Sequence, residues 1–395
     1  MNQEVRSYFV RFTKDELSTI LSYFGQDIPS KAKKAELVDI VSEFIGGHPR
    51  EWLYKLPERD LRLLQTIVVA GMDNWVKMES PEYPSVASIL GLIYVDDNSF
   101  DDIMASMDYA LYYSVSSIVS QVIKEKEADG SFAVERIALG LLNIYGAIPV
   151  EDFVETVFDM FDDEGDGGKE VTLAMADCPM VAMNRVYYKD KVYVISPYAY
   201  DYESIIDGRE DFEEINDFKL YSILEATSAG AGAPFCAFRN AGCEAVEDIL
   251  RSIGYTEGEI REEIHKIWFN AQFAVNDSSA EAIFSSINSR IDDLESFDEY
   301  RKCVDIIAAY ANSVPKWMLN GYTSDEIGQL QLSIKVDESV MEGHGLEEEA
   351  EMDEKLGPLK DYYKYNMAVH HVAADEPCPC GSGLSYCHCH GKRMN

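Results

Sequence analysis

Residues 13–47 read TKDELSTILSYFGQDIPSKAKKAELVDIVSEFIGG, and their pattern predicts two helices joined by an extended turn. Thr13 and Glu16 have the spacing of a capping box, in which each side chain bonds to the other residue's backbone N–H. Apolar residues then recur three and four positions apart on both sides of the turn, as on the buried face of a helix. Gly25 can end the first helix, and Pro29 favours an extended backbone before the second. The segment therefore predicts a small helical unit.

Three lysines lie in the turn between these helices, at Lys31, Lys33 and Lys34. With an apolar plug expected at Ile28, the sequence K-x-K-K-x-E-L resembles the helix–extension–helix domains of the SAP and Rho N-terminal kind, over residues 13–45. Such domains often present their turn lysines to nucleic acid, and the resemblance implies such a contact here. The alternative is a small packing module with solvated lysines, because basic clusters of this size are common on protein surfaces.

The charge of the chain argues against a general nucleic-acid binder. Of its 395 residues, 71 are acidic and 34 are basic, which gives a net charge of −37. Such a field repels phosphate backbones. Residues 1–60, however, carry nine basic against ten acidic residues. The charge therefore leaves open a local contact between basic residues near the N-terminus and nucleic acid.

The sequence predicts a cytoplasmic protein without a membrane span. It contains no stretch of about 18 uninterrupted apolar residues. Its first residues, MNQEVRSYFVRFTKDEL, lack the apolar region and the cleavage site of a secretory signal. In a reducing compartment the scattered cysteines of the body are expected to be buried and unpaired; these are Cys178, Cys236, Cys243 and Cys303.

Periodicity predicts the elements that follow the first helical unit. A helix is expected over residues 58–71, ended by Gly71. A short β-rich run is expected over 85–97, and a long helical stretch over 99–127. Residues 51–130 are therefore interpreted as a helical connector.

Residues 131–205 are predicted to form a winged-helix-like unit. Helices over RIALGLLNIYG and EDFVETVFDMF precede VYYKDKVYVIS, whose two strand-like runs join at Lys189-Asp190 as in a hairpin. Such units bind DNA in many regulators and serve as protein-contact modules in others. Between Glu151 and Glu170 lie nine acidic residues and one lysine. A DNA-facing surface is not expected there.

The third region, residues 206–332, is predicted to be helical throughout. Thr256 and Glu259 form another capping-box pattern. The stretch AGAGA at 229–233 lacks the third glycine and the lysine of a phosphate cradle, so a plain loop is expected there. The predicted helical segments are 215–227, 244–253, 258–271, 279–291 and 296–313.

The C-terminal sequence EPCPCGSGLSYCHCHGKRMN predicts a structural zinc site with Cys378, Cys380, Cys389 and His390 as ligands. Zinc prefers four thiolate or imidazole ligands in a tetrahedron. Cys378 and Cys380 place two sulfurs on one knuckle, and the glycines that follow allow the chain to reverse. Lys392 and Arg393 can offset the net charge of −1 that Zn²⁺ has with three thiolates.

The pattern C-P-C-G-S-G-x5-C-H-G resembles the SEC-C motif, the zinc-binding tail of SecA-type translocation ATPases and of many small bacterial proteins. The stretch PKWMLNGYTSDEI at 315–327 is similar to one found in bacterial proteins that end in such a tail. Cys387 and His388 depart from the usual motif and leave a shifted ligand set open. Leu384 and Ser385 replace the usual lysines, so the family's partners do not transfer directly.

These patterns predict a mainly α-helical, multidomain protein. No G-x-x-x-x-G-K-[ST] motif and no catalytic constellation is present, so an enzyme is not expected. The first hypothesis is a zinc-binding adaptor whose knuckle docks on a protein or ribonucleoprotein partner. The second is a nucleic-acid-associated regulator that uses Lys31, Lys33 and Lys34. The predicted segments are 1–50 (helix–extension–helix), 51–130 (connector), 131–205 (winged-helix-like), 206–332 (helical), 333–375 (acidic linker) and 376–395 (zinc knuckle).

Overall fold

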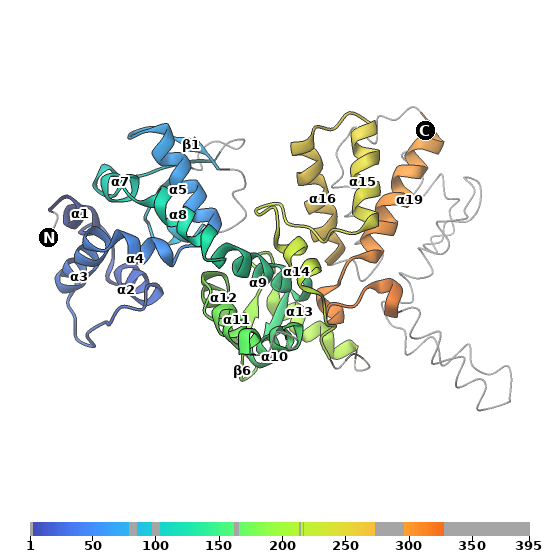
Figure 1. Ribbon diagram of the computed structural model, residues 1–395, viewed down its shortest axis with the longest axis horizontal. Coiled ribbons are helices and arrows are strands. Elements are labelled where there is room, and N and C mark those ends of the chain that lie inside the picture. The colour runs from blue at the N-terminus through green and yellow to red at the C-terminus, as the bar shows by residue number, and fades with distance from the viewer. Residues whose placement is uncertain are drawn as a thin grey trace. The chain divides into compact units, whose positions relative to one another are not determined.

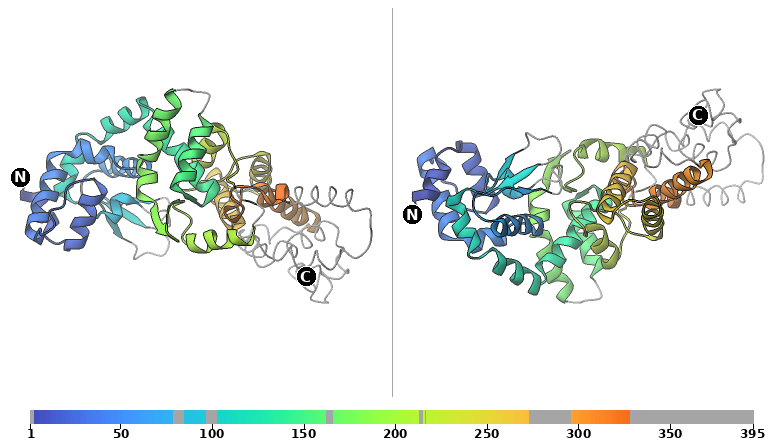
Figure 2. Two further views of the ribbon diagram at one scale, coloured as in Figure 1. Left: turned by 90° about the horizontal axis from the view of Figure 1, so that it is seen from below. Right: turned by 90° about the horizontal axis from the view of Figure 1, so that it is seen from above.

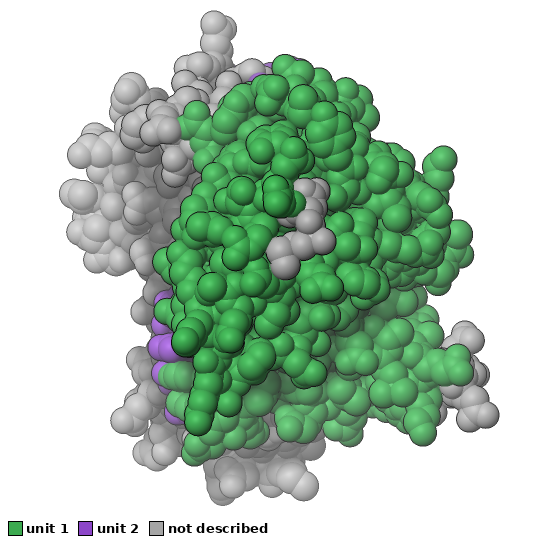
Figure 3. Space-filling model, turned by 90° about the vertical axis from the view of Figure 1, so that its left-hand side faces the viewer, with its two compact units in different colours: residues 1–142, 147–200, 222–234 green, residues 143–146, 201–221, 235–395 purple. Residues whose placement is uncertain are grey.

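The computed structural model describes residues 3–78, 85–96, 103–161, 166–212, 215, 217–272 and 296–327. They divide into two compact units, coloured in Figure 3. Unit 1 lies within residues 1–142, 147–200 and 222–234, and unit 2 within 143–146, 201–221 and 235–395. The described chain is mainly helical with two small antiparallel sheets, which confirms the predicted mainly α class. None of its described helices is long and apolar enough to cross a membrane.

Unit 1 begins with four helices: α1 (Gln3–Phe9), α2 (Lys14–Tyr23), α3 (Lys34–Gly47) and α4 (Pro49–Tyr54). The capping box is confirmed, since the Thr13 N–H donates to Glu16 Oε2 at 2.6 Å and the Glu16 N–H to Thr13 Oγ1 at 3.2 Å. The prediction that Ile28 is a buried apolar plug is wrong, because this residue is 39% exposed. The Ala32 N–H donates to the Pro29 carbonyl at 2.9 Å, and this turn buries Ala32 instead.

The next helix, α5 (Glu58–Ala70), ends at Gly71 as predicted, with Gly71 at a φ of 96°. The expected β-rich run over 85–97 is only half correct. Its first part is the short helix α6 (Val86–Ile89), and only β2 (Tyr94–Asp96) is a strand. The buried carboxylate of Asp60 accepts hydrogen bonds from the Ser85 hydroxyl at 2.7 Å and the Ala87 N–H at 2.8 Å, which stabilises a helical turn there.

The long helical stretch expected over 99–127 is confirmed from Tyr109 onward and wrong over β3 (Met104–Ser106). After β3, this region contains α7 (Tyr109–Ser116) and α8 (Val119–Ala128). Strand β3 lies between β1 (Val76–Lys77) and β2 in the first sheet, in the order β1-β3-β2. Strand pairing with distant residues therefore overrides the local pattern. One hydrophobic core connects this part of unit 1 from Val5 to Phe132.

The remainder of unit 1 is built around the second sheet. Along the chain lie α9 (Ser131–Tyr145), β4 (Ala147–Pro149), α10 (Val150–Met160), α11 (Asp166–Ala176), α12 (Pro179–Met183), β5 (Arg185–Tyr188) and β6 (Lys191–Ile195). The strand order is β4-β6-β5. The predicted hairpin at Lys189-Asp190 is confirmed, with φ values of 45° and 62° at the two turn residues. Helix α14 (Ile223–Gly230) also belongs to unit 1.

Unit 2 contains α13 (Tyr202–Gly208), α15 (Ala241–Ser252), α16 (Glu257–Gln272) and α19 (Phe297–Ser313). Helix α15 packs against both α16 and α19, as Figures 1 and 2 show in yellow and orange. The capping box of Thr256 and Glu259 is confirmed, with Glu259 Oε2 accepting from the Thr256 N–H at 2.8 Å. The four body cysteines are buried and free, as expected.

The helix expected over 215–227 is wrong in its first half. Helix α14 begins only at Ile223, with Ser222 as its N-cap. Before it, the Lys219 N–H donates to the Asn320 carbonyl at 3.1 Å and the Tyr145 hydroxyl donates to the Lys219 carbonyl at 2.7 Å. These tertiary bonds use the backbone groups that a helix would need. The segment expected over 279–291 lies outside the described residues.

Candidate functional site

The predicted zinc ligands Cys378, Cys380, Cys389 and His390 lie outside the residues that the structure describes, as do Cys387 and His388. Among the residues it does describe, no group of three or more His, Cys, Asp or Glu side chains could hold a metal ion. The donor set of the tail, three thiolates and one imidazole, fits the tetrahedral coordination that structural zinc requires. The zinc site in the tail therefore stays a prediction, supported by the chemistry of its four ligands.

The structure places Lys31 and Lys33 in the turn before α3 and Lys34 at the start of that helix, and all three are exposed. Lys33 is the N-cap residue of α3, and its N–H donates to Glu36 Oε2 at 2.8 Å. Lys34 is the first residue of the same helix. The positive end of the helix dipole lies at this terminus, where it favours anions. The lysines thus lie beside a second source of positive potential.

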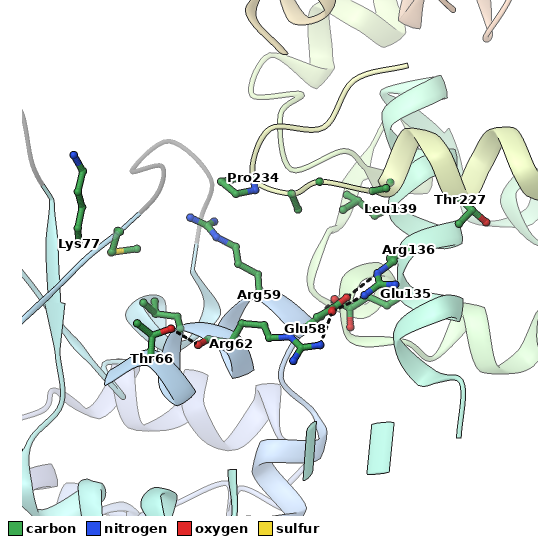
Figure 4. A pocket seen from close by; sticks show the side chains of 16 residues that line it. Glu58, Arg59, Arg62, Thr66, Lys77, Glu135, Arg136, Leu139, Thr227 and Pro234 are labelled. Atoms are coloured by element: carbon green, nitrogen blue, oxygen red, sulfur yellow. Dashed lines mark hydrogen bonds and ion pairs between the residues drawn. The ribbon is translucent and has the colours of Figure 1, made fainter. Parts of the chain in front are cut away.

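A cavity of about 500 Å³ lies within unit 1, and the sequence did not predict it. Four elements line it: α5, β1 with Met78, α9, and the C-terminal part of α14 with the segment 231–234 (Figure 4). Its size is within the usual range of small-molecule sites. The apolar part of the wall includes Leu63, Met78, Leu139 and Pro234.

The charged groups of the cavity wall are mostly basic. Arg59, Arg62, Lys77 and Arg136 line it, against the two carboxylates of Glu58 and Glu135. Glu58 pairs with both Arg62 and Arg136, and Glu127 pairs with Arg62 as well.

An ion-pair network fixes the floor of this cavity. Arg136 binds Glu58 with two parallel bonds, from Nε to Oε2 at 2.9 Å and from Nη2 to Oε1 at 2.6 Å. Arg62 Nη2 contacts Glu58 Oε1 at 3.2 Å and Glu127 Oε1 at 2.6 Å. Paired bonds of this kind hold a guanidinium in one orientation. A guanidinium carries five N–H donors, so Arg136 has donors beyond the two that Glu58 uses.

Glu135 is the buried acid of this wall, only 5% exposed. Its Oε1 accepts a hydrogen bond from the Glu58 N–H at 2.8 Å, whereas its buried Oε2 has no hydrogen-bond partner in the described part of the chain. Burial raises the pKa of Glu135 to about 7, although the nearby Lys126 ammonium lowers it and Glu58 and Asp60 raise it further. Buried polar atoms normally have partners. Oε2 is therefore an exception, and because the atom itself is buried, a group in the cavity does not reach it.

Lys126 is the cation that lowers the pKa of Glu135, and its own ammonium group is bound by backbone carbonyls. Its Nζ donates to the Tyr54 carbonyl at 3.1 Å and to the Leu56 carbonyl at 2.9 Å. Burial lowers the pKa of Lys126, and the carboxylate of Glu135 opposes that shift. Lys126 thus anchors the end of α8 on α4 and does not line the cavity.

Sequence reasoning missed this cavity for a physical reason. Glu58 and Arg62 have the i, i+4 spacing of an ordinary surface pair, and Arg136 lies 78 residues beyond Glu58. The glycine-rich stretch at 229–233 was expected to be a plain loop, and residues 230–233 prove to be part of the cavity wall. The sequence hinted at the cavity only through the arginines at the start of α5 and the glycines at 229–233, which lie far apart in the chain.

No protein-family model, no curated protein and no solved structure matches the chain.

Proposed function

We propose that this chain is a zinc-binding adaptor whose C-terminal segment docks on a protein or ribonucleoprotein partner. The observation that carries the proposal is the spacing of Cys378, Cys380, Cys389 and His390 around a glycine turn. These side chains would hold one zinc ion, and the metal would supply folding energy to a segment too short to form an apolar core. The SEC-C resemblance supports the docking role.

We also propose that residues 131–205 act as a winged-helix-like module for protein contacts. The order of elements supports this: a helix and a strand, then α10 to α12, then the hairpin β5-β6 with a β4-β6-β5 sheet. The acidic residues between Glu151 and Glu170 oppose a phosphate-facing role.

Purified chain should contain one zinc ion per molecule, measured by elemental analysis without chelator. Cys380→Ser, Cys389→Ser and His390→Ala should each lose the metal, because each removes one of four ligands. Cys387→Ser is the matched control and should retain zinc. Less than about half a zinc per chain would contradict the site. Loss of metal in Cys387→Ser with retention in Cys389→Ser would instead shift the ligand set to Cys387 and His388.

The second candidate function is a nucleic-acid-associated regulator, favoured by the location of Lys33 and Lys34 at the N-terminus of α3. Three lysine–phosphate contacts would give a salt slope of about −2.7 in log K on duplex DNA. The acidic remainder of the chain opposes such contacts. We expect no measurable binding of duplex DNA by the full-length protein at physiological salt, followed by fluorescence anisotropy. Tight, sequence-selective binding that is lost when Lys31, Lys33 and Lys34 are all changed to Glu would favour the regulator over the adaptor.

A further inference from the structure

We propose that the outer edge of strand β5 binds an extended acidic peptide of a partner protein, which adds a further strand to the β4-β6-β5 sheet. The proposal deepens the protein-contact role given above to residues 131–205 and rests on it, since it names the surface and the kind of partner. It depends on three observations: the position of β5 in its sheet, the direction of its backbone groups and the charge of its hairpin.

The first observation is the position of β5 at an edge of the sheet. The strand order is β4-β6-β5, so β5 pairs with one strand and β6 with two. The hairpin is also exposed to solvent: Tyr187 of β5 and Val192 of β6 are opposite each other in the register and are 69% and 40% exposed. An exposed edge strand presents a row of backbone N–H and carbonyl groups that can pair with another chain.

The second observation is the direction of the backbone groups of β5. The Ile195 N–H donates to the Asn184 carbonyl at 2.9 Å, directly before the first residue pair of the β5-β6 register. In an antiparallel pair of strands, hydrogen-bonded and non-hydrogen-bonded residue pairs alternate. Arg185 and Tyr187 therefore occupy non-hydrogen-bonded positions, and their N–H and carbonyl groups face away from β6. An added strand would bond to the backbone of these two residues.

The third observation is the charge of the hairpin. Residues 185–195 contain three basic residues and one acidic residue, in a chain of net charge −37. Lys191 is exposed and forms no ion pair within the part of the chain that the structure describes. Arg185 Nη2 donates to the Ala176 carbonyl at 2.7 Å, a neutral partner that leaves the charge of the guanidinium uncompensated. The edge therefore favours a strand that carries carboxylates.

Two other occupants fit this edge less well. The phosphate backbone of a nucleic acid offers acceptors only, so it would leave the outward carbonyls of Arg185 and Tyr187 without donors. A second copy of β5 would place like charges on adjacent strands, which is destabilising. An extended acidic peptide supplies N–H and carbonyl groups at the spacing of a strand together with the opposite charge.

The test is fluorescence anisotropy of the full-length chain with a short labelled peptide of alternating glutamate and threonine. We expect saturable binding. Paired residues of adjacent strands point to the same face of a sheet, so the glutamates that lie beside Arg185 are also the residues whose N–H groups face β5. N-methylation of the glutamates should therefore weaken binding about tenfold or more, and N-methylation of the threonines should weaken it less.

Variants of the chain test the same edge from the other side. Tyr187→Pro removes an N–H that faces away from β6, so the hairpin keeps its own bonds, and the peptide should bind about tenfold more weakly. Tyr187→Ala keeps that N–H and should lose less. Arg185→Gln with Lys191→Gln should weaken binding and reduce its dependence on salt. Thermal melts check that each variant folds, and the N-methylated peptides test the edge on the unaltered chain.

The matched control for charge is Lys33→Gln with Lys34→Gln, which removes two exposed charges at the start of α3 and should leave peptide binding unchanged. Absence of peptide binding, or equal binding by Tyr187→Pro and the unaltered chain, would overturn the edge site but not the protein-contact role, which another face of residues 131–205 can serve. Nucleic-acid binding that is lost in Arg185→Gln with Lys191→Gln would overturn both.

Two further measurements identify a different occupant. A photo-crosslinking phenylalanine analogue in place of Tyr187 should capture the added peptide. Capture of residues 333–375 of the same chain would instead assign the edge to the chain's own acidic segment and overturn the external partner. Sedimentation that shows a dimer, dissociated by Tyr187→Pro, would assign the edge to a second copy and overturn the proposal in the same way.

Discussion

Replacing Trp317 by alanine should lower the free energy of unfolding of unit 2 by about 3–5 kcal/mol, the usual cost of truncating a fully buried aromatic side chain. Trp317 is 0% exposed. Its ring packs edge-on against Trp268 at 6.0 Å and Phe269 at 6.1 Å between centroids. Alanine would leave a cavity among these rings, and the tight packing of protein interiors does not close such a space without further cost.

Two backbone contacts add to the loss. Trp317 Nε1 donates to the Asn143 carbonyl at 2.8 Å, and alanine would remove this bond. Arg209 donates to the Trp317 carbonyl from Nε at 3.0 Å and from Nη2 at 2.8 Å. A displaced residue 317 would weaken this bond as well. A typical hydrogen bond contributes about 0.5–1.5 kcal/mol to stability.

Hydrogen exchange followed by mass spectrometry of peptides from α15, α16 and α19 measures the effect within unit 2. Faster exchange is expected throughout these helices, and peptides from α2 and α3 serve as the internal reference. The matched control is Trp75→Ala, because Trp75 is 46% exposed. That control should change stability by less than about 0.5 kcal/mol. Unchanged exchange in Trp317→Ala would show that this ring is not the centre of the unit 2 core.

Local signals in the sequence were reliable where the structure depends on neighbouring residues. The capping boxes of Thr13 and Thr256 and the hairpin turn at Lys189-Asp190 are all formed as predicted. Each involves residues at most three positions apart, so the interaction that stabilises the element is visible in the sequence itself.

The predictions from the sequence failed where the local structure depends on contacts with residues far away in the chain. Asp60 stabilises the turn at Ser85 through hydrogen bonds over 25 and 27 residues, which turned an expected strand into α6. Strand β3 exists because it pairs with both β1 and β2, and no periodicity over 99–127 reports such pairing. The cavity depends in the same way on Glu58 meeting Arg136 across the fold. The local pattern of the sequence contains no information about such long-range contacts.

Replacing Gly140 by valine should destabilise unit 1 by about 3 kcal/mol, the upper end of the range for overpacking a well-filled interior. A Cβ at Gly140 would lie 1.7 Å from the Ala226 carbonyl oxygen and 2.6 Å from the carbonyl carbon. Both atoms are backbone of α14, so no side chain can rotate away. Helices α9 and α14 would have to separate, and the cavity wall formed by residues 230–233 would move with α14.

The measurement is the midpoint of urea unfolding together with hydrogen exchange of peptides from α9 and α14. Gly47→Ala in α3 is the matched control, because an added Cβ there meets nothing within 4 Å. Alanine is also the better helix former, so this control should be neutral or stabilising by up to about 1 kcal/mol. If Gly140→Val left the midpoint and the exchange of α14 unchanged, the two helices would not cross at Gly140, and the cavity wall built on that crossing would be wrong as well.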